Sequence, residues 1–259
     1  MADTAPGVRF EIADHVATVV IDRPHVLNAV DEPTRLALEA VWTTVETDPD
    51  VWAVVVTGAG DRAFCVGGDL TAAEQEGWAH TYPHGFGGLS LRTSLTVPVI
   101  ARVNGYALGG GMEMVLACDL VIAADHAEFG LVEPRLGRLP LNGGPALLTR
   151  RLPHTAAMGL LLTGRRASAQ ELHRLGLVNE VVPAADLDAA VQRWTTQILA
   201  CAPTSLRALK ESLRETHGLP PAQAAALRTP AMLAALNSPN ADEGVRAHQE
   251  KRPPRWSSP

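Results

Sequence analysis

Short apolar runs of β-branched residues, separated by helical segments, constrain the fold of this chain more than any other feature. The run VWAVVVT at residues 51–57 ends at Gly58, and it suits a strand that is buried on both faces. Similar runs occur at residues 15–21, 98–103 and 120–124. Residues 32–47 carry apolar side chains at helical spacing. Strands that alternate with helices predict a parallel α/β arrangement in the first half of the chain.

The second half of the chain changes character. From about residue 156 onward it reads as one helix after another. Prolines separate these helices at positions 153, 183, 203 and 220. We therefore predict an α/β core over residues 1–200 and a helical region over residues 201–259.

Charge and composition exclude several classes of function. The formal net charge is −6 and no long basic run occurs, which argues against nucleic acid and an anionic membrane as main partners. Cys65, Cys118 and Cys201 are far apart, which suits free thiols in a reducing cytosol. The first residues do not resemble a signal peptide, and no uninterrupted apolar stretch is long enough for a membrane span. We expect a cytoplasmic protein.

The first segment with chemical content is RAFCVGGDL at residues 62–70, which follows the strand-like run closely. Paired glycines after a strand let the backbone approach a ligand and present an N–H to it. A plain loop explains this segment equally well. The nearby Gly58-Ala59-Gly60 imitates a dinucleotide fingerprint, but no helical pattern follows it, so nicotinamide binding is disfavoured.

A second segment joins a strand-like run to three glycines and then to a helix, within residues 99–119. The helix is expected to begin at Gly109–Gly111, where free N–H groups and the positive end of the helix dipole favour an oxyanion. Glu113 falls about one turn along and can face the same point. A glutamate that caps its own helix is the alternative.

A third segment contains Glu133 directly before Pro134, which predicts an extended or turn conformation for the glutamate. The alternative is a surface glutamate paired with Arg135. Neither this segment nor the other two is decisive alone.

Six ordered motifs together resemble the crotonase superfamily, which includes the enoyl-CoA hydratases and isomerases. They are RPHVLNAV, AFCVGGDL, PVIARVNGYALGGGMEMVLACD, FGLVEPRLGRLP, TGRRASAQELHRLGLVNEVVP and EGVRAHQEKRPPRW. The resemblance covers nearly the whole chain. It implies a ClpP-like spiral core of repeated ββα units in two roughly perpendicular sheets, followed by a helical trimerisation region. The parallel α/β pattern by itself does not predict the spiral.

The resemblance also implies a site. In the family two backbone N–H groups hold the thioester oxygen, and the matching positions are Gly68 and Gly110. Family hydratases place two glutamates about the substrate double bond, and these match Glu113 and Glu133. Isomerases commonly keep only the later glutamate, so both together favour hydration or dehydration. We also expect a larger residue at Gly110 to crowd the thioester while the protein still folds.

Coenzyme A is implied as part of the substrate, and we expect no metal and no redox cofactor. The matching substrate-binding positions are Arg23, His25, Val26, Leu27, Ala63, Val66, Gly67, Asp69 and Leu70. Lys251 matches a basic residue that approaches the phosphates of coenzyme A in a neighbouring subunit. His248 replaces an aromatic residue that is usual in this terminal helix. His80 and His84 have a spacing that suits a metal on a helix, but Pro83 breaks the helix and no third ligand is evident.

Departures from the family pattern concern the substrate. Leu141 stands where some members carry an additional acid, which disfavours dienoyl isomerase and dehalogenase chemistry. Val132 and Asn142 also replace more usual residues near the expected acyl pocket. Residues 83–89, with a short helix expected after them, resemble the carnitinyl-CoA dehydratase branch.

We therefore expect a homotrimer or dimer of trimers that adds water to an enoyl-CoA thioester or removes it. An enoyl-CoA isomerase is one alternative. A catalytically weak acyl-CoA-binding member of the family is the other.

Overall fold

Two β-sheets form the body of the protein, in a computed structural model that describes residues 3–69 and 82–259. Within these residues the larger sheet has the order β1-β2-β3-β4-β6-β8-β11, and the smaller has the order β10-β9-β7-β5. The strands of the larger sheet are β1 (Asp3–Ala5), β2 (Val8–Ala13), β3 (Val16–Ile21), β4 (Ala53–Gly58), β6 (Val99–Val103), β8 (Leu120–Ala124) and β11 (Glu180–Val182). Those of the smaller sheet are β5 (Ala63–Cys65), β7 (Tyr106–Leu108), β9 (Glu128–Gly130) and β10 (Ala167–Ser168).

All pairings from β3 to β11 in the larger sheet are parallel, so the predicted parallel arrangement is confirmed there. Strand β2 pairs antiparallel with both β1 and β3, which the apolar runs did not indicate. The family resemblance implied two sheets, but the sequence pattern did not locate the strands of the second, because these have only two or three residues. Such lengths are too short for a visible period.

The helices of the described residues follow the predicted pattern in most places. They are α1 (Glu32–Thr47), α3 (Gly110–Ala117), α4 (Gly144–Arg151), α5 (His154–Thr163), α6 (Ala169–Arg174), α7 (Leu187–Leu199), α8 (Pro203–Thr216), α9 (Pro221–Ala226), α10 (Pro230–Leu236) and α11 (Pro239–Glu250). Short 3-10 turns are η1 (Pro24–Val26), η2 (Phe86–Gly88), η3 (Glu133–Leu136) and η4 (Ala184–Asp186). The expectation of helices alone after residue 156 was wrong at β10 and β11. The short helix expected after residue 89 instead lies inside that segment, as η2.

Helix α1 shows how the sequence sets a local structure. Asp31 caps it by accepting a hydrogen bond from the Thr34 N–H at 3.0 Å, and Pro33 occupies the first turn. Its inner face is apolar and includes Trp42, which is fully buried. The indole N–H of Trp42 donates to the carbonyl of Gly87 at 2.8 Å, so α1 also holds the η2 segment.

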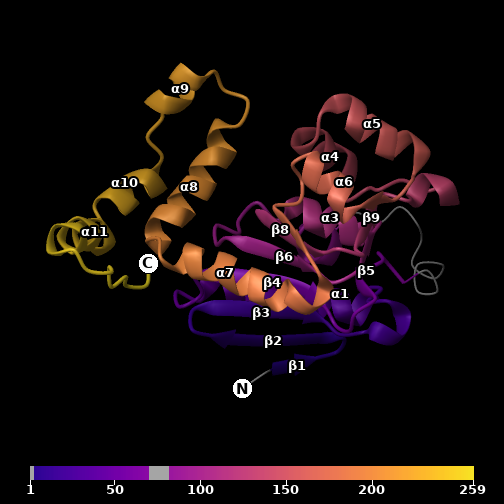
Figure 1. Cartoon of the computed structure of the whole chain (residues 1–259). Helices are drawn as coiled ribbons and strands as arrows, with labels where there is room; N and C mark the ends of the chain where they lie inside the picture. The colour runs from indigo at the N-terminus through magenta and orange to yellow at the C-terminus, as the bar shows by residue number, and fades with distance from the viewer. Residues whose placement is uncertain (1–2, 70–81) are drawn as a thin grey trace.

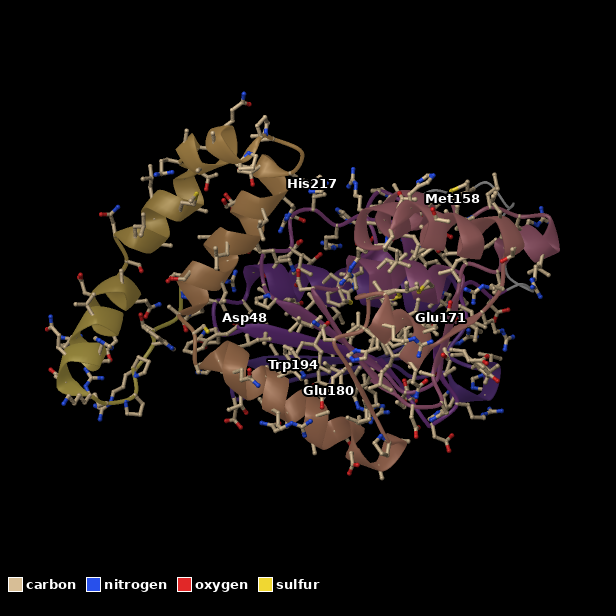
Figure 2. The ribbon with its side chains drawn as sticks, turned by 45° about the horizontal axis from the view of Figure 1, so that its top comes forward. Asp48, Met158, Glu171, Glu180, Trp194 and His217 are labelled. Carbon is tan, nitrogen blue, oxygen red and sulfur yellow. The ribbon has the colours of Figure 1, made fainter. Side chains whose placement is uncertain are left out.

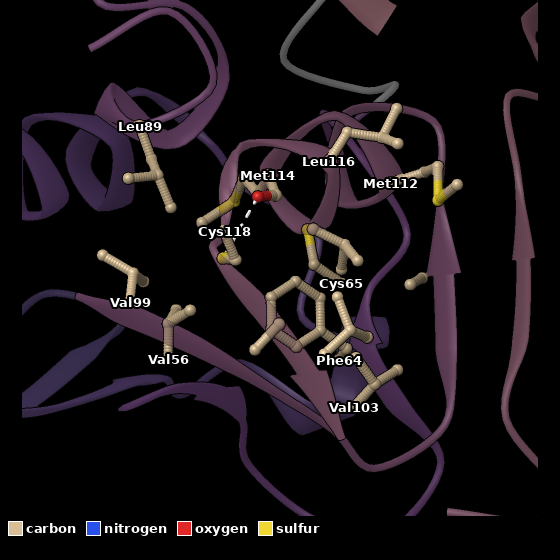
Figure 3. Close-up of a cluster of buried hydrophobic side chains, with 14 of the residues drawn as sticks. Val56, Phe64, Cys65, Leu89, Val99, Val103, Met112, Met114, Leu116 and Cys118 are labelled. Carbon is tan, nitrogen blue, oxygen red and sulfur yellow. Dashed lines mark hydrogen bonds between the residues drawn. The ribbon is translucent and has the colours of Figure 1, made fainter. Parts of the chain in front are cut away.

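Helix α3 lies inside the protein rather than on its surface. All its residues from Gly110 to Leu116 are buried, as expected for a helix that is apolar on every side. Figure 3 shows its Met112 and Met114 in the cluster that also contains Phe64 of β5. At its far end the guanidinium of Arg151 donates to the carbonyl oxygens of Leu116 and Cys118, at 3.0 and 2.7 Å. These bonds satisfy carbonyls that a helix end leaves free.

Helix α7 covers part of the outer face of the larger sheet, where Val191 and its neighbours join a second apolar cluster with Ile100 and Ile122. Its Trp194 indole donates to Glu180 of β11 at 2.7 Å, and Figure 2 shows these two side chains in one region. The helix therefore fixes the last strand of the sheet.

Helices α8 to α11 form a C-terminal arm (residues 203–250) that extends away from the sheets (Figure 1). Its base is tied to the body by Lys210, whose ammonium lies 2.6 Å from Asp119 and 2.7 Å from the carbonyl of Val97. Large apolar side chains on the arm are exposed; they include Leu209, Leu213, Leu233, Leu236 and Val245. The chain then returns, and Trp256 donates to the carbonyl of Ala200 at 3.0 Å.

The division of the chain at residue 200 stays a prediction, although α7 ends at Leu199 and α8 begins at Pro203. No helix in the described part of the chain has the length and apolar content needed to cross a bilayer.

Candidate active site

The two glycine segments predicted from the sequence lie against each other. Strands β5 and β7 pair in parallel, so the loops that follow them leave the smaller sheet at the same edge. We call these loops, Val66–Gly68 and Gly109–Gly111, the glycine mouth. An ideal Cβ on Gly67 would lie 3.3 Å from the Gly110 nitrogen, and one on Gly111 only 2.1 Å from the Cys65 carbonyl oxygen. Side chains at these positions would prevent so close an approach.

The N–H groups of Gly68 and Gly110 are available to a ligand. Gly110 is the first residue of α3, where an N–H has no acceptor within the helix. Around Gly68, Val30 donates to the Gly67 carbonyl and accepts from the Asp69 N–H, both at 2.9 Å, which leaves the Gly68 N–H unused. Within residues 3–69 and 82–259, neither N–H has a protein acceptor.

The ring of Phe86 packs against this mouth. An ideal Cβ on Gly68 would lie 3.9 Å from the ring, which is ordinary contact, but one on Gly110 would lie 2.4 Å from it. A larger residue at Gly110 would therefore collide first with a buried side chain of the protein. The expectation that such a variant still folds stays a prediction, made without Phe86, because the sequence gave no sign of that ring at this place.

Glu113 is buried on α3, with an exposed fraction of only 1%. Its Oε1 accepts hydrogen bonds from the N–H groups of Asn142 and Gly144, both at 2.9 Å. These donors stand at the start of α4, so Glu113 does not cap its own helix. The pKa of Glu113 is raised to about 7, mainly by burial; the two N–H donors oppose the rise, and the charge of Glu133 adds to it.

Glu133 begins η3 and is not the surface residue of the alternative interpretation. Its Oε2 is buried and has no hydrogen-bond partner, and its Oε1 would lie 3.1 Å from an ideal Cβ on Gly109. Arg135 does not pair with it but donates to the carbonyl of Thr163 at 3.0 Å. Burial raises the pKa of the Glu133 carboxyl. An unpartnered buried oxygen beside the glycine mouth is typical of a group that awaits a ligand.

The charge of Glu133 contributes to the raised pKa of Glu113, as expected for two carboxyls that lie near one another. Oε1 of Glu113 already accepts two N–H bonds, so a proton on this residue belongs on Oε2. A carboxyl with a pKa near 7 holds a proton about half the time at neutral pH. It can then either accept or donate one, which suits general acid–base catalysis.

The predicted coenzyme A segments form one continuous surface, held by two buried asparagines that the sequence analysis missed. The amide of Asn28 donates to the carbonyls of Ala59 and Ala63, at 3.0 and 2.7 Å. The amide of Asn104 donates to the carbonyl of Gly60 at 2.7 Å and to that of Ala63 at 3.1 Å. These bonds fix η1 and the residues that follow it, Leu27 among them, against the loop before β5.

The predicted cations differ in availability. Arg23 is committed to two carboxylates, with N···O distances of 2.8 Å to Asp31 and 3.2 Å to Asp69. His25 is exposed on η1, next to half-buried Val26. Leu70 and His80 lie outside the described residues.

Two other predicted groups stand apart from the glutamates. Lys251 ends α11 in the C-terminal arm, on the opposite side of the molecule from α3 (Figure 1). His84 lies 3.0 Å from Glu39. Across the two described ranges, no three side chains of the metal-binding types cluster together.

A cavity of about 540 Å³ lies elsewhere, between α7 and the outer face of the larger sheet. Thr57, Arg102 and Gln192 are among its lining residues, and none of the predicted site residues lines it. It has no part in the arrangement around the glycine mouth.

Comparison with known proteins identifies the family of the chain. Residues 11–259 match the family described as Enoyl-CoA hydratase/isomerase. The chain belongs to this family. The crotonase resemblance read from the six motifs is thereby confirmed, and with it the enzyme class and the two-sheet fold.

Relatives in the enoyl-CoA hydratase/isomerase family cover nearly the whole chain. A carnitinyl-CoA dehydratase of Proteus mirabilis is 40% identical over 93% of this chain and 94% of its own length. An (E)-benzylidenesuccinyl-CoA hydratase of Thauera aromatica is 39% identical over 79% of this chain and 81% of its own. The crystal structure of an enoyl-CoA hydratase of Mycobacterium tuberculosis superposes with a TM-score of 0.90 at 33% identity, covering 97% of this chain and 99% of that one.

Proposed function

We propose that the protein adds water to, or removes it from, the α,β double bond of an acyl-coenzyme A thioester, with Glu113 and Glu133 as the proton-transferring groups. The observation that carries the proposal is the pair of buried carboxyls, Glu113 and Glu133, beside the glycine mouth. The relatives named as a dehydratase and a hydratase of CoA thioesters support the same reaction class.

The thioester oxygen is held by the N–H groups of Gly68 and Gly110. Negative charge develops on that oxygen when the α-carbon gains or loses a proton. The start of α3 adds the positive end of its dipole at the same point. Donors of this kind typically lower a barrier by roughly 3–4 kcal/mol each.

The two glutamates divide the proton transfers. In the hydration direction Glu113, whose Oε1 is held by two N–H donors, takes a proton from the attacking water through Oε2. Glu133, whose burial favours its neutral form, gives a proton to the α-carbon. Dehydration runs through the same steps in reverse.

Coenzyme A binds along η1 and the loop that leads into the glycine mouth. The charge of Arg23 is already neutralised by its two carboxylate partners. Its role is therefore to order this surface. His25 is the better candidate for the phosphates, since it is exposed. Lys251 adds a cation from a neighbouring chain. The exposed leucines of the C-terminal arm support a trimer or a dimer of trimers, because so much apolar surface favours burial by a partner.

The test is turnover of purified enoyl-CoA and 3-hydroxyacyl-CoA esters, with carnitinyl-CoA and (E)-benzylidenesuccinyl-CoA in the panel. Hydration is followed as loss of the near-ultraviolet absorbance of the conjugated thioester, and mass spectrometry identifies the product. A product heavier by one water supports the proposal. An isomerase instead moves the double bond of a 3-enoyl-CoA with no change of mass. A protein that binds these esters and converts none would contradict both.

A further inference from the structure

Asn142, which donates to Glu113, is itself held by a hydroxyl from another part of the chain. The Asn142 carbonyl accepts a hydrogen bond from Ser90 Oγ at 2.7 Å. The same Oγ accepts from the Phe86 N–H at 2.8 Å. Ser90 is buried, so its hydroxyl exchanges little with water. These bonds therefore link the Phe86 backbone to Ser90, Ser90 to the Asn142 carbonyl, and, through the Asn142 backbone, the Asn142 N–H to Glu113.

The segment that carries Ser90 is fixed from its other side. The guanidinium of Arg92 is almost fully buried, donates to the Gly88 carbonyl at 2.7 Å and contacts Glu46 at 2.9 Å and Glu39. Helix α1 supplies both carboxylates. A buried, paired arginine of this kind holds its surroundings in one arrangement, because separating the pair would leave charge unpaired. Ser90 therefore presents its hydroxyl from a rigid position.

The loop on the receiving side depends on that hydroxyl. Residues 140–143 lie before α4 and have no regular backbone ladder of their own. The Asn142 side chain adds one long contact, at 3.5 Å to the Tyr82 N–H. Of these two links from the Asn142 residue to residues 82–92, the Ser90 bond is the shorter by 0.8 Å. The bond holds the Asn142 carbonyl, and the Asn142 N–H is joined to that carbonyl through a single Cα, so losing the bond loosens the backbone that directs the N–H at Glu113.

We propose that Ser90 is a positioning residue for the reaction, which holds the Asn142 carbonyl and thereby the backbone at Asn142, so that its N–H stays on Oε1 of Glu113. Oε2 then stays directed toward the water. The inference rests on the proposed function. Its geometric content does not, because the hydrogen-bond path exists without substrate.

The proposal predicts a specific change in proton affinity. A hydrogen bond to the ionised form lowers a carboxyl pKa, so losing the Asn142 donor raises the pKa of Glu113 above its value of about 7. Glu133 is the charged group that faces Glu113 within the described residues, and the substitution of Ser90 leaves it in place. The limb of the rate profile that reports Glu113 should therefore move to higher pH.

The experiment compares Ser90→Ala with wild type and with Ser94→Ala as the matched control. Ser94 belongs to the same segment but donates to Glu46 at 2.5 Å, away from Glu113. We expect Ser90→Ala to lower kcat on the order of tenfold, as for a small misplacement of a catalytic group. KM should change little. The acidic limb of the kcat/KM profile should move to higher pH by roughly half to one unit. Ser90→Thr, which keeps the hydroxyl, should recover most of the loss, and Ser94→Ala should behave like wild type.

A second measurement separates failure of this inference from failure of the proposed function. Titration of the Glu113 carboxyl by ¹³C NMR, assigned with Glu113→Gln, needs no substrate. A higher pKa in Ser90→Ala supports the positioning role even if no ester in the panel is turned over. An unchanged pKa in folded Ser90→Ala overturns it, and so does a loss of kcat with an unchanged pH profile.

Discussion

The glycine mouth and the C-terminal arm differ in how completely a single chain satisfies them. Around the mouth, backbone groups approach so closely that a methyl group does not fit at Gly111, and Glu113 has two donors of its own. On the arm, Leu213 and Leu236 are each 68% exposed. The comparison teaches that the proposed catalytic groups all come from one chain, whereas the arm leaves large apolar side chains that the chain itself does not cover.

Replacing either glutamate should have the largest effect. We expect Glu113→Gln and Glu133→Gln each to lower turnover by a factor on the order of 10² or more, with little change in coenzyme A affinity, because each removes a proton-transferring group. Steady-state kinetics measures this. Glu128→Gln is the control, since that glutamate forms a surface pair with Arg166. Near-normal turnover in either active-site variant would remove that residue from the mechanism.

The burial of Glu113 should cost the folded state stability as pH rises. Its pKa is raised from an ordinary 4.5 to about 7, so the folded protein binds this proton more tightly than the unfolded chain does. The contribution of this group to the free energy of unfolding is therefore highest below pH 4.5. It falls by roughly 3 kcal/mol as pH rises from 4.5 through 7. Glu113→Gln lacks this dependence.

Denaturant unfolding of both proteins between pH 5 and 8 checks it. Glu113→Gln should gain on wild type across this range, and parallel curves would show that burial does not perturb the group.

The tightness of the mouth can be tested against an open glycine. Gly111→Ala should lower stability by about 1–3 kcal/mol, because the new methyl would meet the Cys65 carbonyl. Gly159→Ala in α5 meets nothing within 4 Å and should raise stability by roughly 0.5–1 kcal/mol. Thermal melts of the two variants compare them directly. Equal melting temperatures would mean that the mouth is looser than its geometry indicates.

The arm should show the smallest effect on the chemistry of the site. We expect Leu213→Asp to reduce the mass in light scattering toward that of one chain, while circular dichroism and the pH profile of the glutamates stay as in wild type. Leu162→Asp is the control, because Leu162 is exposed on α5 outside the arm. A wild-type protein that is monomeric at micromolar concentration would contradict the proposed trimer.

Much of this fold could be predicted because its signals are local. The strand at residues 51–57, helix α1 and the start of α3 after three glycines each follow from neighbouring residues. The pairing of β5 with β7 could not, since three-residue strands show no period. Nor could the bonds of Asn28, whose partner at Ala63 is 35 residues away. The family resemblance supplied the spiral arrangement.

The candidate site divides in the same way. Glu113 follows from its place one turn into α3, but its donors at Asn142 and Gly144 come from a loop about 30 residues later. Ser90 gave no signal, because a single serine in a glycine-rich segment has no pattern. The family resemblance proposed which groups react. It could not predict which groups hold them.

Helix α3 is packed closely against Cys65 at Gly111, and Arg151 binds the carbonyls at its other end. The proposed oxyanion donor at its start would therefore be preorganised, and little reorganisation energy would be spent when a thioester binds. The part of the site that every CoA ester shares is thus the part least able to move. Adaptation to a different acyl group would have to come from surrounding residues that hold neither the oxyanion donors nor Glu113.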